Sequence, residues 1–189
     1  WYDGFKSRSS IPEELLSAKT SKLYPDPEAF EADLPIILEK LGWSRARSEY
    51  LADKIVVDPA RGSGHAAGAG MRGSLSHLRT RITEKGMDYK GYNIAIHEFG
   101  HNVEQTISMY DVDYYMMAGV PNTACTEAMA FVFQDRDLSL LGLSDTNPAG
   151  EKMEILDQAW SLMEIMGAGM VEMRVWKWLY DNPDATASK

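Results

Sequence analysis

The sequence predicts a mostly helical α+β fold, in which one small β-sheet lies beside a buried helix. Two observations lead to this expectation. Apolar residues recur at helical spacing over most of the 189 residues, and only the segments near 55–58 and 76–82 resemble strands. Hydrophobic residues make up 44% of the chain, which is enough for a real core. We expect one compact unit, made of an N-terminal helical segment (1–54) and a core region (55–189).

The first part of the chain contains three helix starts, each marked by a residue that can cap a helix. Proline in the first turn strengthens two of them, because its missing N–H is not needed there. The predicted helices begin at Ser10 with Pro12 in the first turn, run from Asp26 to Leu41 before Gly42, and run from the cap Ser44 to about Lys54.

Two short strands are expected next, at Ile55–Asp58 and within Leu75–Ile82, where Leu-Arg-Thr-Arg-Ile alternates as in a half-exposed strand. Between them, the stretch from Gly62 to Gly70 holds four glycines, too many for a packed element. It contains no G-K-[ST] and is therefore not a P-loop. The two flanking strands are expected to form the small sheet.

The remaining pattern is helical. In the last helix, Met and Trp residues at helical spacing are most simply explained as core, and two glycines are candidate bends. The predicted helices are 89–105 with Asp88 as cap, 122–140 with Asn122 or Thr123 as cap after Pro121, and about 145–180, with Gly167 and Gly169 as bends and Met153, Leu156, Trp160 and Met163 as the core stripe.

The most specific motif is His97-Glu98-Phe99-Gly100-His101, an H-E-x-x-H pattern on the predicted helix 89–105. The i, i+4 spacing places both imidazoles on one face of the helix, where they can bind one Zn²⁺. Glu98 lies near the open side of such an ion and can take a proton from water as a general base. Gly100 indicates either a close approach by another chain segment or simple tolerance.

A catalytic zinc site needs a third protein ligand. No histidine follows His101, so a carboxylate from a second helix is the remaining common solution. Glu127 is the only acid between Asp113 and Asp135, and it lies in an apolar helix, where an unpaired carboxylate is costly. Zinc coordination explains Glu127 better than a position on a solvent edge. The predicted ligands are His97, His101 and Glu127, with one position open.

These residues resemble zinc oligopeptidases of the thimet oligopeptidase and oligoendopeptidase F type, a branch of the gluzincins. The resemblance rests on HEFGH, on Glu127 in a T-E-A sequence about 26 residues after His101, and on the upstream segment D-P-A-R-G-S-G-H (58–65). It covers roughly residues 55–140. It implies a zincin-like metallopeptidase domain that hydrolyses oligopeptides, with His97, His101 and Glu127 as zinc ligands and Glu98 as general base.

The resemblance also implies a larger parent protein. The chain starts at Trp1 without a signal peptide, and it stops at Lys189 before any segment matching the tyrosine and histidine donors that the family uses near the end of its catalytic domain. We therefore expect the rest of a parent chain beyond Lys189 as a partner, and weak activity for this fragment alone. An edge strand of the small sheet can pair with an extended peptide substrate.

Composition and net charge argue against two classes of binding partner, nucleic acid and membrane. A formal net charge of −9 argues against nucleic acid and an anionic membrane surface, and no apolar run is long enough to span a bilayer. The single cysteine, Cys125, excludes an internal disulfide framework and is expected to be a small core residue. The compartment stays open, with the cytoplasm as the default expectation.

Other candidates are weaker. His65 and His77 are more often structural than catalytic, and a tyrosine among Tyr110, Tyr114 and Tyr115 is more often packed or bonded to backbone than an oxyanion donor. The E-x-x-H within the motif also occurs in di-iron bundles, but no second E-x-x-H is present. A catalytically incomplete or inactive domain that binds peptide or metal remains the alternative function.

Overall fold

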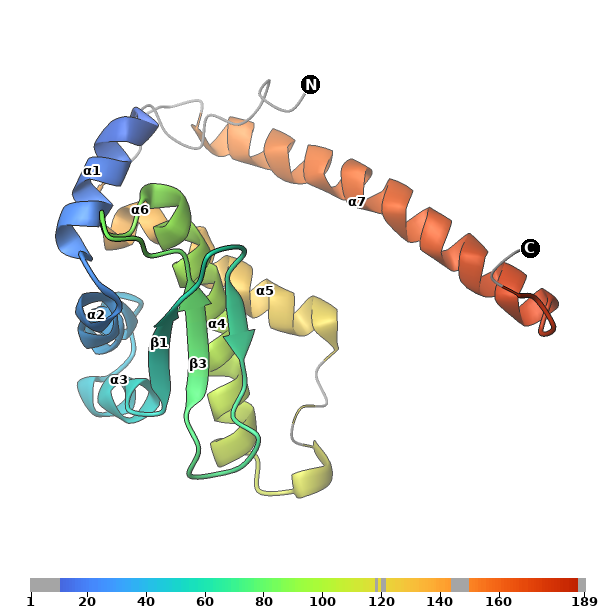
Figure 1. The fold of residues 1–189 in the computed structure, drawn as a ribbon, viewed down its shortest axis with the longest axis horizontal. Helices are drawn as coiled ribbons and strands as arrows, with labels where there is room; N and C mark the ends of the chain where they lie inside the picture. Colours follow the sequence, from blue (N-terminus) through green and yellow to red (C-terminus); the bar gives the residue numbers. More distant parts are fainter. Residues whose placement is uncertain (1–10, 118, 120–121, 144–149, 187–189) are drawn as a thin grey trace. The chain divides into compact units, whose positions relative to one another are not determined.

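The computed structural model describes residues 11–117, 119, 122–143 and 150–186. They are mostly helical, with one three-stranded mixed sheet, which confirms the predicted mostly helical α+β class. In chain order the elements are α1 (Glu13–Leu23), α2 (Pro27–Lys40), α3 (Arg45–Ala52), β1 (Ile55–Pro59), β2 (His65–Ala67), β3 (Ser76–Thr80), α4 (Tyr89–Asp111), the 3₁₀ turn η1 (Tyr115–Met117), α5 (Thr123–Gln134), α6 (Asp137–Leu140) and α7 (Gly150–Asp181) (Figure 1).

The sheet has the strand order β1-β3-β2, so the last strand in the sequence is inserted between the two that precede it. β1 runs parallel to β3, with Ile55 opposite Ser76, and β2 runs antiparallel to β3, with His65 opposite Arg79. The predicted strands are confirmed, but the expectation that the glycine-rich stretch holds no packed element is wrong. β2 forms there because β3 supplies its hydrogen-bonding partners, and the local sequence does not show this.

Helix α4 is the centre of the larger packed unit and runs behind the sheet (Figure 1). One face of α4 is buried against β3, where Leu78 lies, and its Tyr92 ring meets the Phe30 ring of α2 edge-on. The buried side chains are Tyr92, Ala95, Ile96, Phe99 and Val103 of α4, with Phe30, Leu34 and Leu38 of α2. Burial of this face leaves the adjoining face of α4, which carries the H-E-x-x-H histidines, directed toward α5.

The predicted caps are largely confirmed. Asp26 accepts a hydrogen bond from Ala29 N at 2.8 Å, and Asp88 accepts one from Gly91 N at 2.7 Å. Ser44 caps α3 and Asn122 caps α5 in the same way, through their side-chain oxygens. Each of these bonds satisfies an N–H that has no partner within its own helix. The proposed cap Ser10 lies outside the described residues, and α1 begins after Pro12.

The predicted helix 122–140 is two helices, because the chain turns at Asp135 and Arg136 between α5 and α6. The turn directs the Asp137 side chain inward, where it is 6% exposed and accepts hydrogen bonds from two residues of α4. Cys125 is exposed on α5, so its predicted place in the core is wrong. The residue lies in the first turn of α5, whereas the buried residues of this helix, Ala130 and Phe133, lie further along it.

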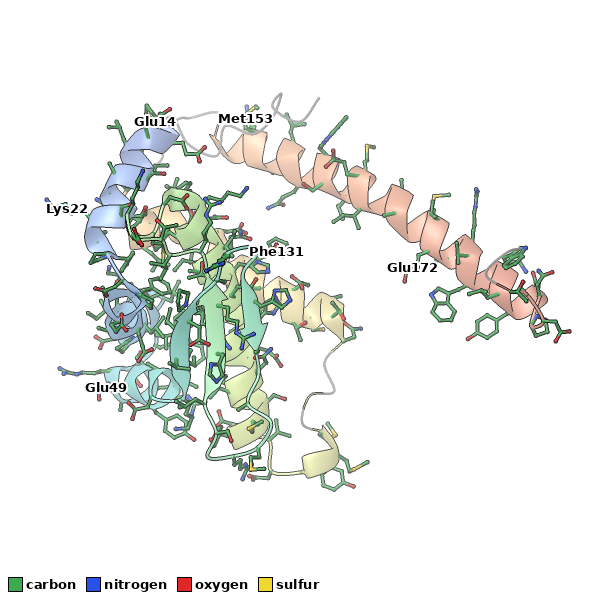
Figure 2. The ribbon with its side chains drawn as sticks, viewed as in Figure 1. Glu14, Lys22, Glu49, Phe131, Met153 and Glu172 are labelled. Atoms are coloured by element: carbon green, nitrogen blue, oxygen red, sulfur yellow. The ribbon has the colours of Figure 1, made fainter. Side chains whose placement is uncertain are left out.

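The described residues divide into two compact units, Ile11–Ser144 and a second that contains α7. α7 continues unbroken through Gly167 and Gly169, and Asp145–Pro148, predicted to start it, lies outside the described residues. Figure 2 shows its side chains, Met153 and Glu172 among them, projecting along its length.

The predicted core stripe on α7 is wrong for two members, since Leu156 is 47% and Met163 is 66% exposed. Among the described residues, the hydrophobic core is built from α1–α6 and the sheet, and it contains no residue of α7. Helical spacing of apolar residues therefore predicted the helix correctly but not what covers it. None of the described helices combines the length and apolar character that a membrane span requires.

Candidate metal centre

The three predicted ligands converge although they come from two helices. His97 Nε2 lies 3.3 Å from one carboxylate oxygen of Glu127, and His101 Nε2 lies 3.5 Å from the other. The two imidazole centroids are 4.9 Å apart, with ring planes at 81°. One potential ligand atom from each of the three residues lies within 4.8 Å of the other two. The structure therefore brings together the three side chains that the sequence indicated.

Close packing of α4 on α5 produces this convergence. A β-carbon added at Gly100 would come within 2.7 Å of Ala130 Cα and 3.1 Å of Met129 O, both in the backbone of α5. Real β-carbons do not approach atoms that closely, so only glycine allows this helix spacing. Of the two explanations for Gly100, close approach is therefore confirmed. The contact lies one residue before His101 and three after Glu127.

The donor set and its spacing fit zinc. Two imidazole nitrogens and one carboxylate oxygen are the protein ligands of several catalytic zinc centres. With metal–ligand bonds of about 2.0–2.1 Å and tetrahedral angles, ligand atoms lie about 3.3–3.4 Å apart. The nitrogen–oxygen distances of 3.3 and 3.5 Å are close to this value, but they run to the two different oxygens of Glu127. The residues present therefore fit the ion once the carboxylate turns one oxygen toward both imidazoles.

Glu98 lies in a groove together with the candidate ligands. The lining of this groove comes from α4, α5, strand β2 with the glycine before it, and the loop before α5; its members are Gly64, His65, Ala66, His97, Glu98, His101, Glu104, Gln105, Gly119, Thr126 and Glu127. A β-carbon added at Gly64 would lie 2.2 Å from Ile94 Cγ2 and 3.1 Å from Glu98 Cγ. The glycine-rich segment thus lies directly against Glu98 and limits where that side chain can go.

Two contacts orient His97. Its Nδ1 lies 3.0 Å from Gln134 Oε1, and the Phe131 ring meets the imidazole edge-on at 5.2 Å. Gln134 in turn donates to Asn93 Oδ1 at 2.7 Å. Neither Gln134 nor Asn93 was predicted from the sequence to belong to this centre. The available signal was spacing, because Asn93 lies four residues before His97, and Gln134 lies seven after Glu127, so each shares a helix face with a ligand.

The groove is acidic, with Glu98, Glu104 and Glu127 around its walls. Partial burial raises the pKa of the Glu104 carboxyl, and the nearby His101 opposes that rise. Three carboxylates within one groove attract cations, whether a metal ion or a basic substrate group.

The other candidate side chains divide between the groove and the scaffold. His65 lines the groove. His77 Nδ1 is paired with Asp58 Oδ2 at 2.6 Å, across the two strands β3 and β1. Tyr110 OH accepts a hydrogen bond from Gly73 N at 2.8 Å, as expected for a tyrosine bonded to backbone. Tyr114 is 67% exposed, and the side chain of Tyr115 lies outside the described residues.

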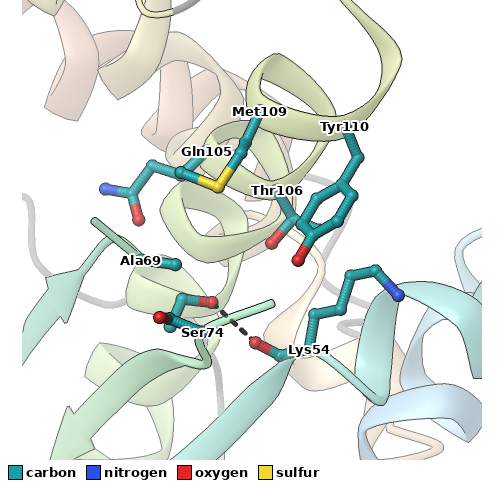
Figure 3. Close-up of a pocket in the computed structure, with 8 residues that line it drawn as sticks. Lys54, Ala69, Ser74, Gln105, Thr106, Met109 and Tyr110 are labelled. Atoms are coloured by element: carbon teal, nitrogen blue, oxygen red, sulfur yellow. Dashed lines mark hydrogen bonds between the residues drawn. The ribbon is translucent and has the colours of Figure 1, made fainter. Parts of the chain in front are cut away.

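A second, much smaller cavity lies between α4 and the start of the sheet (Figure 3). Figure 3 shows Gln105, Thr106 and Tyr110 of α4 facing Lys54 and the loop before β3. The space holds about one water molecule, which the otherwise unsatisfied Gln105 Oε1 can bind. It is too small for a substrate, which leaves the groove around Glu98 as the candidate reaction site.

Comparisons of the chain with protein-family models, curated proteins and solved structures found no match. The chemistry of the centre therefore follows from its own side chains.

Proposed function

We propose that this protein is a zinc-dependent metallopeptidase. The observation that carries the proposal is the convergence of His97, His101 and Glu127 on one point, with Glu98 in the same groove. The chain supplies three ligands and leaves the groove side free, which is the arrangement of catalytic rather than structural zinc. The helix with H-E-x-x-H behind a small mixed sheet also supports the finer assignment of a zincin-like fold.

When bound, a zinc ion supplies Lewis acidity, which makes water more acidic and polarises the carbonyl of a scissile peptide bond. Glu98 then accepts the proton of the attacking water on a carboxylate oxygen. The same oxygen later donates that proton to the nitrogen of the leaving amine. Glu98 serves both steps because it lies between the two ligands in sequence and lines the groove that the substrate enters.

An extended peptide is the substrate that this groove fits. β2 lies at one edge of the sheet, and His65 and Ala66 of this strand line the groove. A peptide that adds to this edge gains main-chain hydrogen bonds and passes beside Glu98. Gly64, packed directly against Glu98, keeps the distance between the edge strand and the general base short. Oligopeptides are therefore the proposed substrate class.

The experiment compares the chain with its Glu98→Gln variant, both loaded with zinc and incubated with a mixed peptide library. Glutamine has the same shape but cannot accept the proton, and loss of a general base lowers turnover by about 10²–10⁴-fold. We expect equal zinc content and cleavage only by the unsubstituted chain, abolished by a chelator and restored by zinc. Cleavage at equal rates by both proteins would refute the mechanism, and failure of the unsubstituted chain to bind zinc would refute the metal centre.

A further inference from the structure

A line of hydrogen bonds runs from His97 into the interior of the larger unit. His97 Nδ1 faces Gln134 Oε1 at 3.0 Å, and Gln134 Nε2 donates to Asn93 Oδ1 at 2.7 Å. Asn93 Nδ2 donates to Asp137 Oδ2 at 2.6 Å. Two amides therefore connect a candidate metal ligand to a carboxylate that belongs to neither the groove nor the ligand set.

Asp137 fixes one end of this line as an acceptor. The side chain is 6% exposed, and it receives hydrogen bonds from Tyr89 OH at 2.8 Å and Leu138 N at 2.5 Å in addition to Asn93. A carboxylate offers only acceptor sites, and three donors point at its two oxygens. Asn93 must therefore present its NH₂ group, not its oxygen, to Asp137.

That requirement determines the orientation of the Gln134 amide and the ring nitrogen of His97 that carries the proton. If Asn93 presents NH₂ to Asp137, its oxygen faces Gln134, which must donate. Gln134 then presents its oxygen to His97, so the facing ring nitrogen of His97 must carry the proton. We infer that Asp137, acting through Asn93 and Gln134, holds the proton of His97 on Nδ1 and so keeps Nε2 available as the metal ligand.

The inference rests on the proposed zinc centre and gives these three residues a positioning role. Metal-bound histidines usually donate their second ring N–H to an acceptor, and loss of that partner weakens metal binding by about 10–100-fold. Here the direct acceptor is a neutral amide, and an amide alone does not fix which of its two ends faces the ring. The buried Asp137 carboxylate, connected to Gln134 through Asn93, fixes which end of the Gln134 amide faces the ring.

The test measures zinc affinity by competition with a chelating indicator for the complete chain and a set of variants. Gln134→Leu removes the acceptor, and we expect zinc to bind about 10–100-fold more weakly. Gln134→Glu restores an acceptor of similar length, so affinity should equal or exceed that of the unsubstituted chain. Asp137→Asn keeps the shape but not the fixed direction, with an expected loss of up to about 10-fold. The matched control is Gln158→Leu, an exposed glutamine of α7 that does not line the groove, which should leave affinity unchanged.

A second readout separates this role from a merely structural one. In the cobalt-loaded protein, each ligating histidine gives its own shifted signal from the exchangeable proton on the nitrogen that is not bound to metal. In Gln134→Leu and Asp137→Asn, the His97 signal should broaden through faster exchange with water while the His101 signal stays. If Asp137→Asn does not fold, Asn93→Leu, which interrupts the line between Asp137 and Gln134, takes its place in both readouts.

The two proposals fail in different ways. If the unsubstituted chain binds zinc tightly but all variants match it in affinity and in the His97 signal, the positioning role is refuted and the metal centre stands. If Gln134→Leu weakens binding while Asp137→Asn changes neither readout, Gln134 acts alone and the relay from Asp137 is refuted. If the unsubstituted chain binds no zinc, the metal centre is refuted and the inference falls with it.

Discussion

Gly100 of α4 lies against Ala130 of α5 so closely that the missing β-carbon would come within 2.7 Å of the Ala130 Cα. This single contact sets the distance between the helix that carries two candidate ligands and the helix that carries the third. At the present spacing one Glu127 oxygen lies near the imidazole of His97 and the other near that of His101. A larger spacing between the helices would move the carboxylate away from both imidazoles.

We predict that Gly100→Ala lowers both stability and zinc affinity. The added methyl must push the α5 backbone away, and overpacking of this kind typically costs about 1–3 kcal/mol. That cost equals or exceeds the gain of about 1 kcal/mol that alanine normally brings to a helix, and contact with rigid backbone atoms places it toward the upper end. Thermal unfolding and zinc competition measure the two effects.

The control for this substitution is Gly167→Ala, a helical glycine of α7 around which the β-carbon would meet no atom within 4 Å. It should be neutral or slightly stabilising and leave zinc affinity unchanged. Equal behaviour of the two variants would show that the close approach at Gly100 has no energetic weight.

Zinc should stabilise the chain through Glu127. A ligand that binds only the folded protein adds about 2.7 kcal/mol to the free energy of unfolding at a free concentration 100 times its dissociation constant. Glu127→Ala should abolish most of this gain, because one of three ligands is lost. Glu104→Gln, which alters another carboxylate of the same groove, should keep it. Unfolding of each protein with and without zinc gives the comparison, and an unchanged zinc response in Glu127→Ala would remove Glu127 from the ligand set.

Gly64→Ala should impair turnover more than zinc binding. The new methyl would overlap Ile94 and press on Glu98, and displacement of a reacting group by about 1 Å can cost about 10²-fold in rate. Gly62→Ala is the matched control, because nothing lies within 4 Å of a β-carbon there. Peptide cleavage and zinc affinity are measured for both variants. Loss of zinc in Gly64→Ala, or equal cleavage by the two variants, would contradict this role of Gly64.

The chain should lose stability as pH rises above about 10. Burial raises the pKa of the Tyr92 and Tyr24 phenols well above the ordinary value, and for Tyr24 a hydrogen bond to Asp33 adds to the shift. A raised pKa in the folded state gives stability that is complete below the unfolded pKa and is lost as pH rises past it.

We therefore expect ionisation of these two tyrosines, followed by ultraviolet absorbance, to coincide with unfolding followed by circular dichroism. Tyr24→Phe should weaken the pH dependence above 10. Ionisation of all tyrosines while the chain remains folded would contradict the prediction.

Local sequence was sufficient to predict those features whose physical cause lies within a few residues. The caps Asp26, Asp88 and Asn122 bond to N–H groups three residues away, and such pairs are visible in the sequence. The spacing of His97 and His101 fixes their common helix face for the same reason. Glu127 could be proposed as a ligand because a single carboxylate among apolar neighbours needs an explanation.

Features that depend on distant partners could not be predicted in this way. β2 exists because β3 pairs with it, and the short His65–Ala67 segment has no strand pattern of its own. The break between α5 and α6 brings in Asp137, the first residue of α6, whose side chain accepts hydrogen bonds from Tyr89 and Asn93, more than 40 residues earlier. The exposed position of Cys125 likewise depends on where the core lies, which composition does not specify.

The insertion of β3 between β1 and β2 has a consequence for how the protein is made. Neither of the first two strands has a neighbour in the sheet until β3 has been synthesised, so their backbone groups stay with water until then. A chain that ends before Ser76 would therefore contain no sheet, and β2 would not yet be an edge strand. α4 follows β3 after a short connection, so during synthesis the sheet and the helix that carries Glu98 become available one directly after the other. The third candidate ligand, on α5, is added only after both.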